Sequence, residues 1–187
     1  IAYCGLARYA RQEETTILEI DPKIKDDDRI LSGDKIKLTY HQEELKNLFI
    51  PKNAKAITPV TGFKKSHVDS INYLNEIYFE DRLEGSELLS SFFNGSIKSI
   101  LISGMAKTTY HVFEDSIYQA KNNASGDTII MRFNENELTQ LNIIGGSTGE
   151  YLPDSISNDI NSPINYSANN ILFLHLTVRL HCSMVDC

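Results

Sequence analysis

The sequence predicts a mainly β protein made of two tandem, homologous modules that resemble β-sandwiches. The first observation is an internal duplication, in which Gly33 to Ile50 aligns without gaps on Gly126 to Ile143. The second is an alternating apolar pattern inside each copy, which is typical of a strand with one buried face. The third is a series of short β-branched and aromatic runs between turn-forming residues. A module of the α+β class is the alternative.

The duplication sets the expected domain organisation. Two copies of the aligned stretch lie 93 residues apart, and random pairing in such a window gives about one identity. The identical positions are Gly33/Gly126, Asp34/Asp127, Ile36/Ile129, Glu44/Glu137, Leu45/Leu138, Leu48/Leu141 and Ile50/Ile143. The same offset aligns Thr15-Thr16 with Thr108-Thr109. We therefore divide the chain into a first β module, 1–93, and a second β module, 94–187.

The predicted strands occupy equivalent places in the two copies. Thr16 to Ile20 and Thr109 to Phe113 are β-branched and aromatic runs that end at acidic, turn-forming residues. A Gly-Asp turn then precedes a strand in each copy. The side chains expected on its buried face are Ile36, Leu38 and Tyr40 in the first copy, and Ile129, Met131 and Phe133 in the second.

The segments after these strands have a different pattern. HQEELKNLF and NENELTQLN carry Leu pairs three residues apart, which predicts a helical turn or a short helix. Asn residues within Ser70 to Glu80 and within Pro163 to Val178 predict a turn between two strands, and the final strand reads as fully buried. Leu83 to Ile102 mixes a helix-like stretch with a turn near Asn94 to Ser96, where the module boundary falls.

Composition and charge exclude several classes of function. The net charge is -7 and the isoelectric point is near 5.2. Binding to nucleic-acid phosphates or anionic lipid requires a basic face, so neither partner is expected. No run approaches the 18 apolar residues of a membrane helix, so no membrane insertion is expected. With 41% hydrophobic residues and 23% charged residues, the chain is expected to bury a core.

An acidic stretch between two predicted strands is a candidate metal site. Crowded carboxylates supply the hard oxygen ligands that Ca²⁺ prefers. The candidate ligands are Asp21, Asp26, Asp27, Asp28 and Asp34. Their spacing departs from the calcium-loop motif D-x-[DN]-x-[DN]-G, so a solvated acidic loop is the competing interpretation. No cofactor is expected from the sequence, and calcium at this stretch is the alternative.

Cys4 and His111 form the candidate catalytic pair. A thiolate beside an imidazole acts as a nucleophile when an Asp or Asn orients the ring, and Asp127 or Asp115 is available for that role. Cys4 precedes a helix-like run, GLARYARQE. The competing interpretation of His111 is a strand residue without a catalytic role.

A second metal set lies near the carboxyl end of the chain. His175 and His181 fall on the same side of an expected strand, and Cys182 and Cys187 follow them. These four residues lack the C-x-x-C spacing of structural zinc sites. A terminal strand without metal is the competing interpretation.

The favoured function is a non-enzymatic binding or structural role. Two similar β modules would present faces or loops to a macromolecular partner, either a protein or a glycan, outside the cell or on its surface. The expected partner-facing loops are Asn53 to His67 and Gly145 to Asn161, because they differ most between the copies. The alternative is a cysteine-dependent hydrolase or transferase of the toxin or effector type that uses Cys4, His111 and Asp127.

Overall fold

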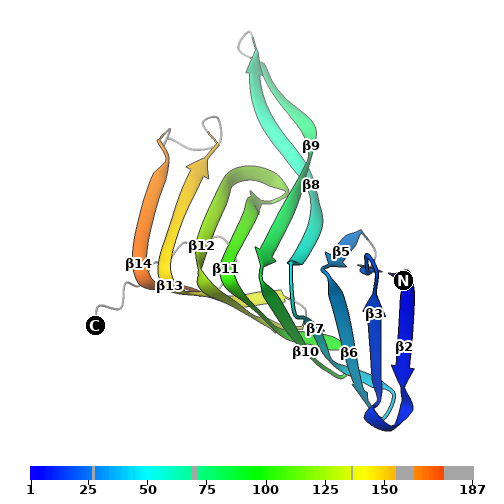
Figure 1. The fold of residues 1–187 in the computed structure, drawn as a ribbon. Helices are drawn as coiled ribbons and strands as arrows, with labels where there is room; N and C mark the ends of the chain where they lie inside the picture. Colours follow the sequence, from blue (N-terminus) through cyan, green and yellow to red (C-terminus); the bar gives the residue numbers. More distant parts are fainter. Residues whose placement is uncertain (27, 69–70, 136, 155–161, 175–187) are drawn as a thin grey trace.

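The computed structural model describes residues 1–187 except 27, 69–70, 136, 155–161 and 175–187. Its described residues form one 14-stranded sheet in which nearly all neighbours are antiparallel (Figure 1). They contain no α-helix and only one short 3-10 turn, η1 (Arg11–Glu13). The mainly β prediction is confirmed, and no helix of the described part is long and apolar enough to span a bilayer.

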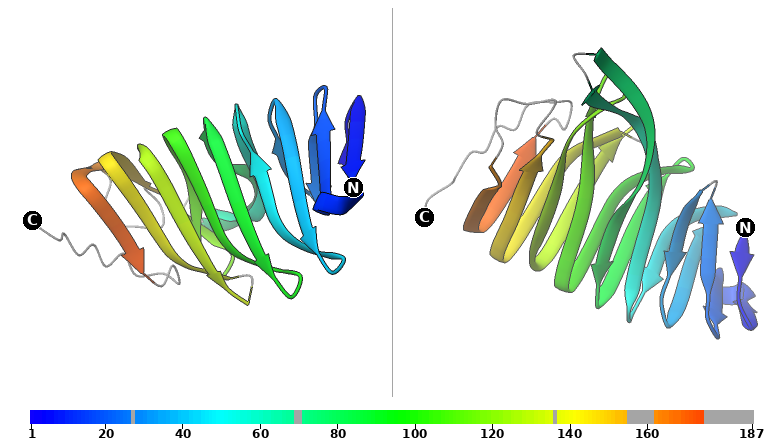
Figure 2. Two further views of the ribbon diagram at one scale, coloured as in Figure 1. Left: turned by 60° about the horizontal axis from the view of Figure 1, so that its bottom comes forward. Right: turned by 90° about the horizontal axis from the view of Figure 1, so that it is seen from above.

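The strands differ in length along the chain. Short strands come first: β1 (Ala2–Tyr3), β2 (Leu6–Ala10), β3 (Thr15–Glu19), β4 (Lys23–Asp26), β5 (Arg29–Ser32), β6 (Lys35–His41) and β7 (Glu44–Ile50). Mostly long strands follow: β8 (Ala54–Val68), β9 (Ile71–Gly85), β10 (Glu87–Phe93), β11 (Ser96–Glu114), β12 (Ile117–Asn134), β13 (Glu137–Pro153) and β14 (Ile164–Leu174). The long strands are curved rather than flat (Figure 2).

The sheet is folded along one line into two leaves. The pairing register shifts between Ser103 and Ala106 of β11, and the pairs of β12, β13 and β14 shift at the neighbouring positions. Residues with positive φ mark these shifts at Gly104, Gly145 and Gly146. Such bulges bend a strand sharply. Leaf A contains β2, β3, β6, β7, β10 and residues 96–103, 128–134, 137–144 and 170–174; leaf B contains β1, β4, β5, β8, β9 and residues 106–114, 117–125, 147–153 and 164–168.

The sequence duplication corresponds to two equivalent hairpins of leaf A. In the β6–β7 hairpin Leu38 pairs with Leu48, and 93 residues later Met131 pairs with Leu141. Each hairpin also shifts register at the equivalent position before its turn. The Gly of each Gly-Asp pair lies at the bend, where a Cβ atom on Gly126 would lie 2.7 Å from Cγ2 of Ile143. Gly33 lies against Ile50 in the same way.

The structure adds a third copy that the sequence comparison missed. Gly85 to Ile102 has the same length, and its Gly again lies against its final Ile, with the Cβ position 2.6 Å from Cγ1 of Ile102. Its turn is Asn94-Gly95, with both residues at positive φ. The unit that repeats is therefore an 18-residue hairpin. The predicted module boundary at 93/94 falls in the turn of this third hairpin, and the division into 1–93 and 94–187 stays a prediction.

Aliphatic side chains of both halves of the chain form one core between the leaves. Leaf A supplies the large ones nearest the bend, all with 0% exposure: Ile36, Ile50, Leu88, Ile102, Ile129 and Ile143. Leaf B opposes them with small side chains, Ala54, Ala106 and Ala124. Large residues packing onto small ones let the two leaves approach closely near the bend.

Several predicted elements are wrong. HQEELKNLF and NENELTQLN form a hairpin turn and a strand rather than a helix, because Leu48 of β7 and Leu141 of β13 are in the core and Leu45 of β7 packs against it. The helix-like stretch after Leu83 is strand β10, and GLARYARQE is mostly β2. No turn divides Ile71–Gly85, which is one long strand. In β14, residues 164–170 are mostly exposed, whereas Ile171 and Phe173 are buried and Leu172 is half-buried; the rest of the predicted buried strand lies beyond the residues whose burial is described.

One hairpin leaves the plane of leaf B. β9 pairs with β11 only from Lys107↔Glu84 to Thr109↔Arg82, whereas its pairing with β8 continues to Val68↔Ile71. Residues 58–68 and 71–81 therefore form an arm that projects beyond the sheet (Figure 1).

Candidate functional site

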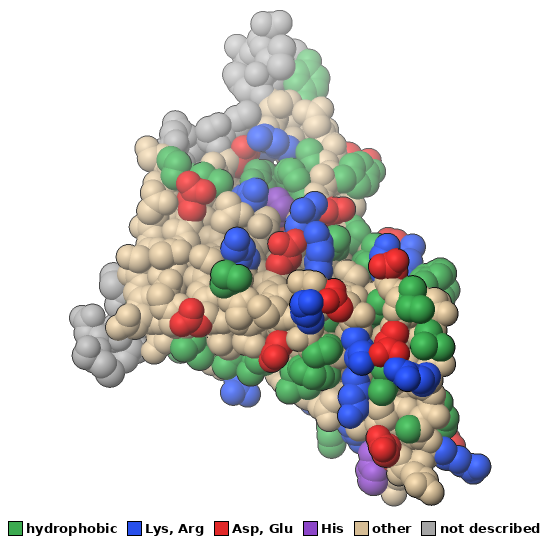
Figure 3. Space-filling view, in the orientation of Figure 1, with side chains coloured by type: hydrophobic (Ala, Val, Ile, Leu, Met, Phe, Trp, Pro, Cys, Tyr) green, Lys and Arg blue, Asp and Glu red, His purple; other side chains and the backbone are tan. Residues whose placement is uncertain are grey.

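A pocket lies in the fork where the arm separates from β11. It has a volume of about 610 Å³. Its lining residues are Pro59, Tyr78, Phe79, Glu80, Arg82, Thr109, His111 and Lys121. Thr109, His111 and Lys121 alternate along their strands with the inward-facing Thr108 and Asn122, so this fork pocket is on the outer face of leaf B. In the space-filling view, Lys and Arg side chains lie interspersed with Asp and Glu side chains over this part of the molecule (Figure 3).

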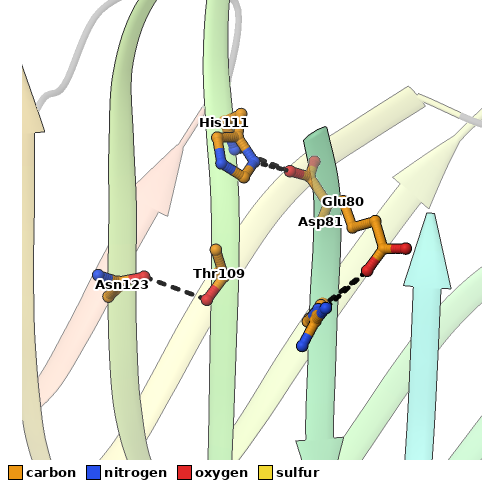
Figure 4. A network of polar contacts seen from close by, with 6 residues as sticks. Glu80, Asp81, Thr109, His111 and Asn123 are labelled. Atoms are coloured by element: carbon orange, nitrogen blue, oxygen red, sulfur yellow. Dashed lines mark hydrogen bonds and ion pairs between the residues drawn. The ribbon is translucent and has the colours of Figure 1, made fainter. Parts of the chain in front are cut away.

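Asp81 and His111 join the arm to leaf B inside the fork. The Oδ1 atom of Asp81 accepts hydrogen bonds from the backbone N–H of His111 and from its Nδ1, both at 2.8 Å (Figure 4). The imidazole stacks on the ring of Phe79, with centroids 4.3 Å apart and planes 2° from parallel. The side chain of His111 is 7% exposed and that of Asp81 is 16% exposed. Beyond Arg82, β9 no longer pairs with β11. The Asp81 carboxylate accepts the hydrogen bond of the His111 backbone N–H instead.

Burial dominates the electrostatics of this pair. It raises the pKa of the Asp81 carboxyl above its ordinary value, although the hydrogen bonds from His111 oppose this change. Burial, and then the nearby Asp81 charge, also raise the pKa of Tyr110. The arm is therefore held by a desolvated carboxyl group that depends on its two hydrogen-bond donors.

The other strand of the arm contacts the tip of the β11–β12 hairpin. The backbone N–H of Phe63 donates to the carbonyl of Ser116 at 2.7 Å. Nζ of Lys64 lies 2.9 Å from Oδ1 of the buried Asp154 and 5.7 Å from the ring centroid of Tyr118. A Cβ atom on Gly62 would lie 2.5 Å from the ring of Phe113, so only glycine allows this close approach. The arm is thus fixed at two separate points.

The inner face of leaf A is a second candidate site, because its burial decreases with distance from the bend. Ile129 is 0% exposed, and Met131, two residues closer to the hairpin tip, is half-buried. The neighbouring strand shows the same change from Ile102, which is fully buried, to Ile100, which is half-buried. A row of partly exposed apolar side chains therefore lies between the leaves, away from the bend: Tyr40, Leu45, Phe92, Ile100 and Met131.

The inner face of leaf B opposite this row is more polar. Tyr166 donates a hydrogen bond from its hydroxyl group to Oδ1 of Asn122 at 2.7 Å, and its ring packs edge-on against Phe173. Tyr110 and Tyr151 are half-buried nearby in the register of the same leaf. Away from the bend, the inner face of leaf A is thus apolar, whereas the inner face of leaf B carries aromatic hydroxyl and amide groups.

The structure brings His111 together with Asp81 rather than with the predicted catalytic partners. Cys4 lies between β1 and β2, half-buried against the core, and does not line the fork pocket. Asp127 lies at the bend of β12, beside Gly145. No hydrogen bond or ion pair among the described residues joins His111 to either of them. The catalytic assignment of Cys4, His111 and Asp127 stays a prediction, and Asp81 had no distinguishing motif in the sequence.

The predicted calcium ligands are spread over two bends and a hairpin. Asp21 lies at the bend between β3 and β4, Asp26 and Asp28 flank the β4–β5 turn, and Asp27 lies outside the described residues. Asp34 accepts a hydrogen bond from Nδ2 of Asn53 at 2.7 Å and lies 3.3 Å from Nζ of Lys52. Within the described part of the chain, no three His, Cys, Asp or Glu side chains are placed to hold a metal ion.

The remaining predicted sites are changed or undescribed. The zinc set of His175, His181, Cys182 and Cys187 lies outside the described residues. The predicted partner-facing loops are mainly strands: Asn53 to His67 is almost entirely β8, and Gly145 to Pro153 belongs to β13. Their sequences differ between the copies because one forms the arm and the other continues leaf B.

The described residues form a single long, mostly antiparallel sheet folded on itself, and solved structures of known proteins are similar to it. No family profile and no curated protein sequence matches the chain. The fold is similar to the crystal structure of LptH, the LptA homologous periplasmic component of the conserved lipopolysaccharide transport device from Pseudomonas aeruginosa. The TM-score is 0.51 at 10% identity, covering 90% of this chain and 92% of that one. At this identity the likeness shows the fold alone.

Proposed function

We propose that this chain is a non-enzymatic carrier that binds an amphiphilic lipid between the two leaves of the sheet. The observation that carries the proposal is the decrease in burial along the inner face of leaf A, from Ile129 to Met131 and from Ile102 to Ile100. The fold supports it, because the similar LptH structure is that of a periplasmic component of a lipopolysaccharide transport device.

The apolar side of the site suits acyl chains. Each Å² of apolar surface removed from water contributes about 25 cal/mol. The half-buried row that includes Ile100 and Met131 is contiguous with the core, so a chain lying on it would extend the core toward the hairpin tips. An acyl chain has no polar group that would need a partner there. This side of the site is therefore matched to a long aliphatic group.

The opposite side of the site suits a polar headgroup. The amide of Asn122 and the hydroxyl of Tyr166 form a hydrogen-bonded pair on the inner face of leaf B. Tyr side chains combine an apolar ring with a polar tip, which fits the boundary between acyl chains and a wet headgroup. An amphiphile thus fits this space better than a purely apolar ligand.

We propose that the protein acts outside the cytoplasmic membrane. We also propose that a protein partner binds at one edge of the sheet. All residues of β2 are exposed, and among the described strands β2 pairs only with β3. An unpaired edge can receive a further strand through its backbone N–H and C=O groups. Such an edge gives a soluble carrier a place to meet another β protein.

The test compares two adjacent residues of β12 on opposite faces. Met131 is on the inner face, whereas Ile130 is half-buried on the outer face. We expect a fluorescent fatty acid, dansyl-undecanoic acid, to bind saturably to the protein. Met131→Asn should weaken binding about fivefold, because a partly buried Met side chain contributes about 1 kcal/mol. Ile130→Asn is the matched control and should leave the dissociation constant within about twofold.

Urea unfolding of both variants provides the check on folding. Equal loss of affinity in the two variants, or no saturable binding by the folded wild-type protein, would refute the proposal. Preferential loss in Met131→Asn supports the inner face as the binding site.

A further inference from the structure

We propose that the fork pocket is a second binding site, one that accepts a phosphorylated monosaccharide. The pocket lies on the outer face of leaf B, across the sheet from the inner face discussed above. This inference does not rest on the lipid-carrier proposal, and either one can fail without the other.

The positive charges around the pocket favour an anion. Arg82 and Lys121 contribute two cations to the lining and Glu80 contributes one anion, in a chain whose net charge is -7. No ion pair among the described residues uses Lys121. The lining therefore has the opposite sign of charge from the protein as a whole, which concentrates anions locally.

Arg82 can exchange its present partner for a ligand. Its Nη2 and Nε atoms donate to Oε2 of Glu80 at 2.7 and 3.2 Å, and the two side chains are 50% and 48% exposed. Exposed ion pairs of this kind contribute little to stability. A phosphate group offers the guanidinium a bidentate, charge-assisted contact, which is stronger than a pair with a solvated carboxylate.

The floor of the pocket is rigid. His111 is fixed because it donates two hydrogen bonds to the Asp81 carboxylate and stacks on Phe79. Lys121 is the cross-strand neighbour of His111, so its backbone is held by the β11–β12 ladder. Groups that are already positioned lose little conformational freedom when a ligand binds.

The size and the walls of the pocket indicate more than an inorganic ion. Its volume of about 610 Å³ is within the range of small-molecule sites. Pro59, Phe79 and the largely exposed Tyr78 contribute apolar surface to the lining. The negative face of an aromatic ring attracts the C–H edge of a sugar ring, while Thr109 supplies a hydroxyl group for hydrogen bonding. In a sugar that carries one phosphate, the C–H edge of the ring contacts the apolar part of the lining and the phosphate contacts the cations.

Isothermal titration with glucose 1-phosphate, glucose and inorganic phosphate tests this site. We expect saturable binding of glucose 1-phosphate that is at least about tenfold tighter than binding of the other two probes. Lys121→Gln and Arg82→Gln should each weaken it about tenfold, since each removes a charge-assisted contact. Lys107→Gln is the matched control, because Lys107 is exposed on the same face of β11 but does not line the pocket.

The following outcomes would overturn the assignment. The first is no saturable binding of glucose 1-phosphate to the folded protein. The second is equal binding of inorganic phosphate, which would remove the sugar from the proposal. The third is an equal effect of Lys107→Gln and Lys121→Gln. Displacement of a bound fluorescent fatty acid by glucose 1-phosphate would likewise contradict a separate outer site, whereas simultaneous binding of both supports it.

Discussion

Replacing Asp81 by Ala should destabilise the protein far more than replacing its neighbour Glu80. Asp81 Oδ1 accepts two hydrogen bonds of 2.8 Å from His111, whose side chain is 7% exposed. Removing the acceptor leaves a backbone N–H and a ring nitrogen without their partner, at about 1–3 kcal/mol each. Relief of the buried carboxylate offsets part of this loss. The expected net loss is about 3 kcal/mol.

Urea unfolding and thermal melting measure this loss. For a chain of 187 residues, about 3 kcal/mol lowers Tm by about 6–12 °C. Glu80→Ala removes only an exposed pair with Arg82, so its loss should stay below about 1 kcal/mol. Asp81→Asn keeps one acceptor oxygen and should fall between the two. If Asp81→Ala is no more destabilising than Glu80→Ala, the carboxylate does not hold the arm and the reasoning fails.

Three further predictions concern the bends and the sheet edge. Gly126→Ala should cost about 1–3 kcal/mol in urea unfolding through its contact with an Ile, whereas Ser125→Ala should be nearly neutral. By NMR titration the Asp34 carboxyl should show a lowered pKa, and Asn53→Ala should raise it, because the Asn53 hydrogen bond is the largest cause. Its stabilising contribution is present above the ordinary Asp pKa and is lost as pH falls through the lowered value. Ala7→Pro should prevent a partner strand from pairing with β2, measured as loss of the partner in a pull-down, while lowering the stability of the protein little. Unfolding of the Ala7→Pro protein would contradict this prediction.

The three hairpins show which parts of the repeat are kept in the sequence and which are not. Gly33 and Ile50 are conserved between the two copies found by alignment because the Gly must fit against the Ile at the bend. The third hairpin keeps this pair as Gly85 and Ile102 but places Ser90 where the others have Leu38 and Met131. The Gly–Ile contact at the bend is kept in all three hairpins, whereas the strand position holds Leu, Met or Ser. Alignment by identity therefore recovered two hairpins and missed one.

The candidate sites were less predictable than the fold. His111 was noticed as a potential base, but its partner Asp81 lies 30 residues away on a strand that diverges from β11. The predicted partners Cys4 and Asp127 are fixed by other parts of the sheet. No local sequence motif identifies a carboxylate that accepts hydrogen bonds from a neighbouring strand. The Asp81–His111 contact could be recognised only once the position of the arm against leaf B was known.

The sequence by itself determined the β class and the alternating buried positions such as Ile36 and Ile129, because both depend on local sterics and on a period of two. It predicted a helix after His41 wrongly, since Leu pairs three apart also suit a strand that shifts register at a bulge. The tertiary structure alone decided that the hairpins join into one sheet, that the sheet folds into two leaves, and that the arm forms the fork pocket. These features depend on pairing between strands that are distant in the sequence. Backbone hydrogen bonds permit such pairing in many registers, and burial of the shared core selects one of them.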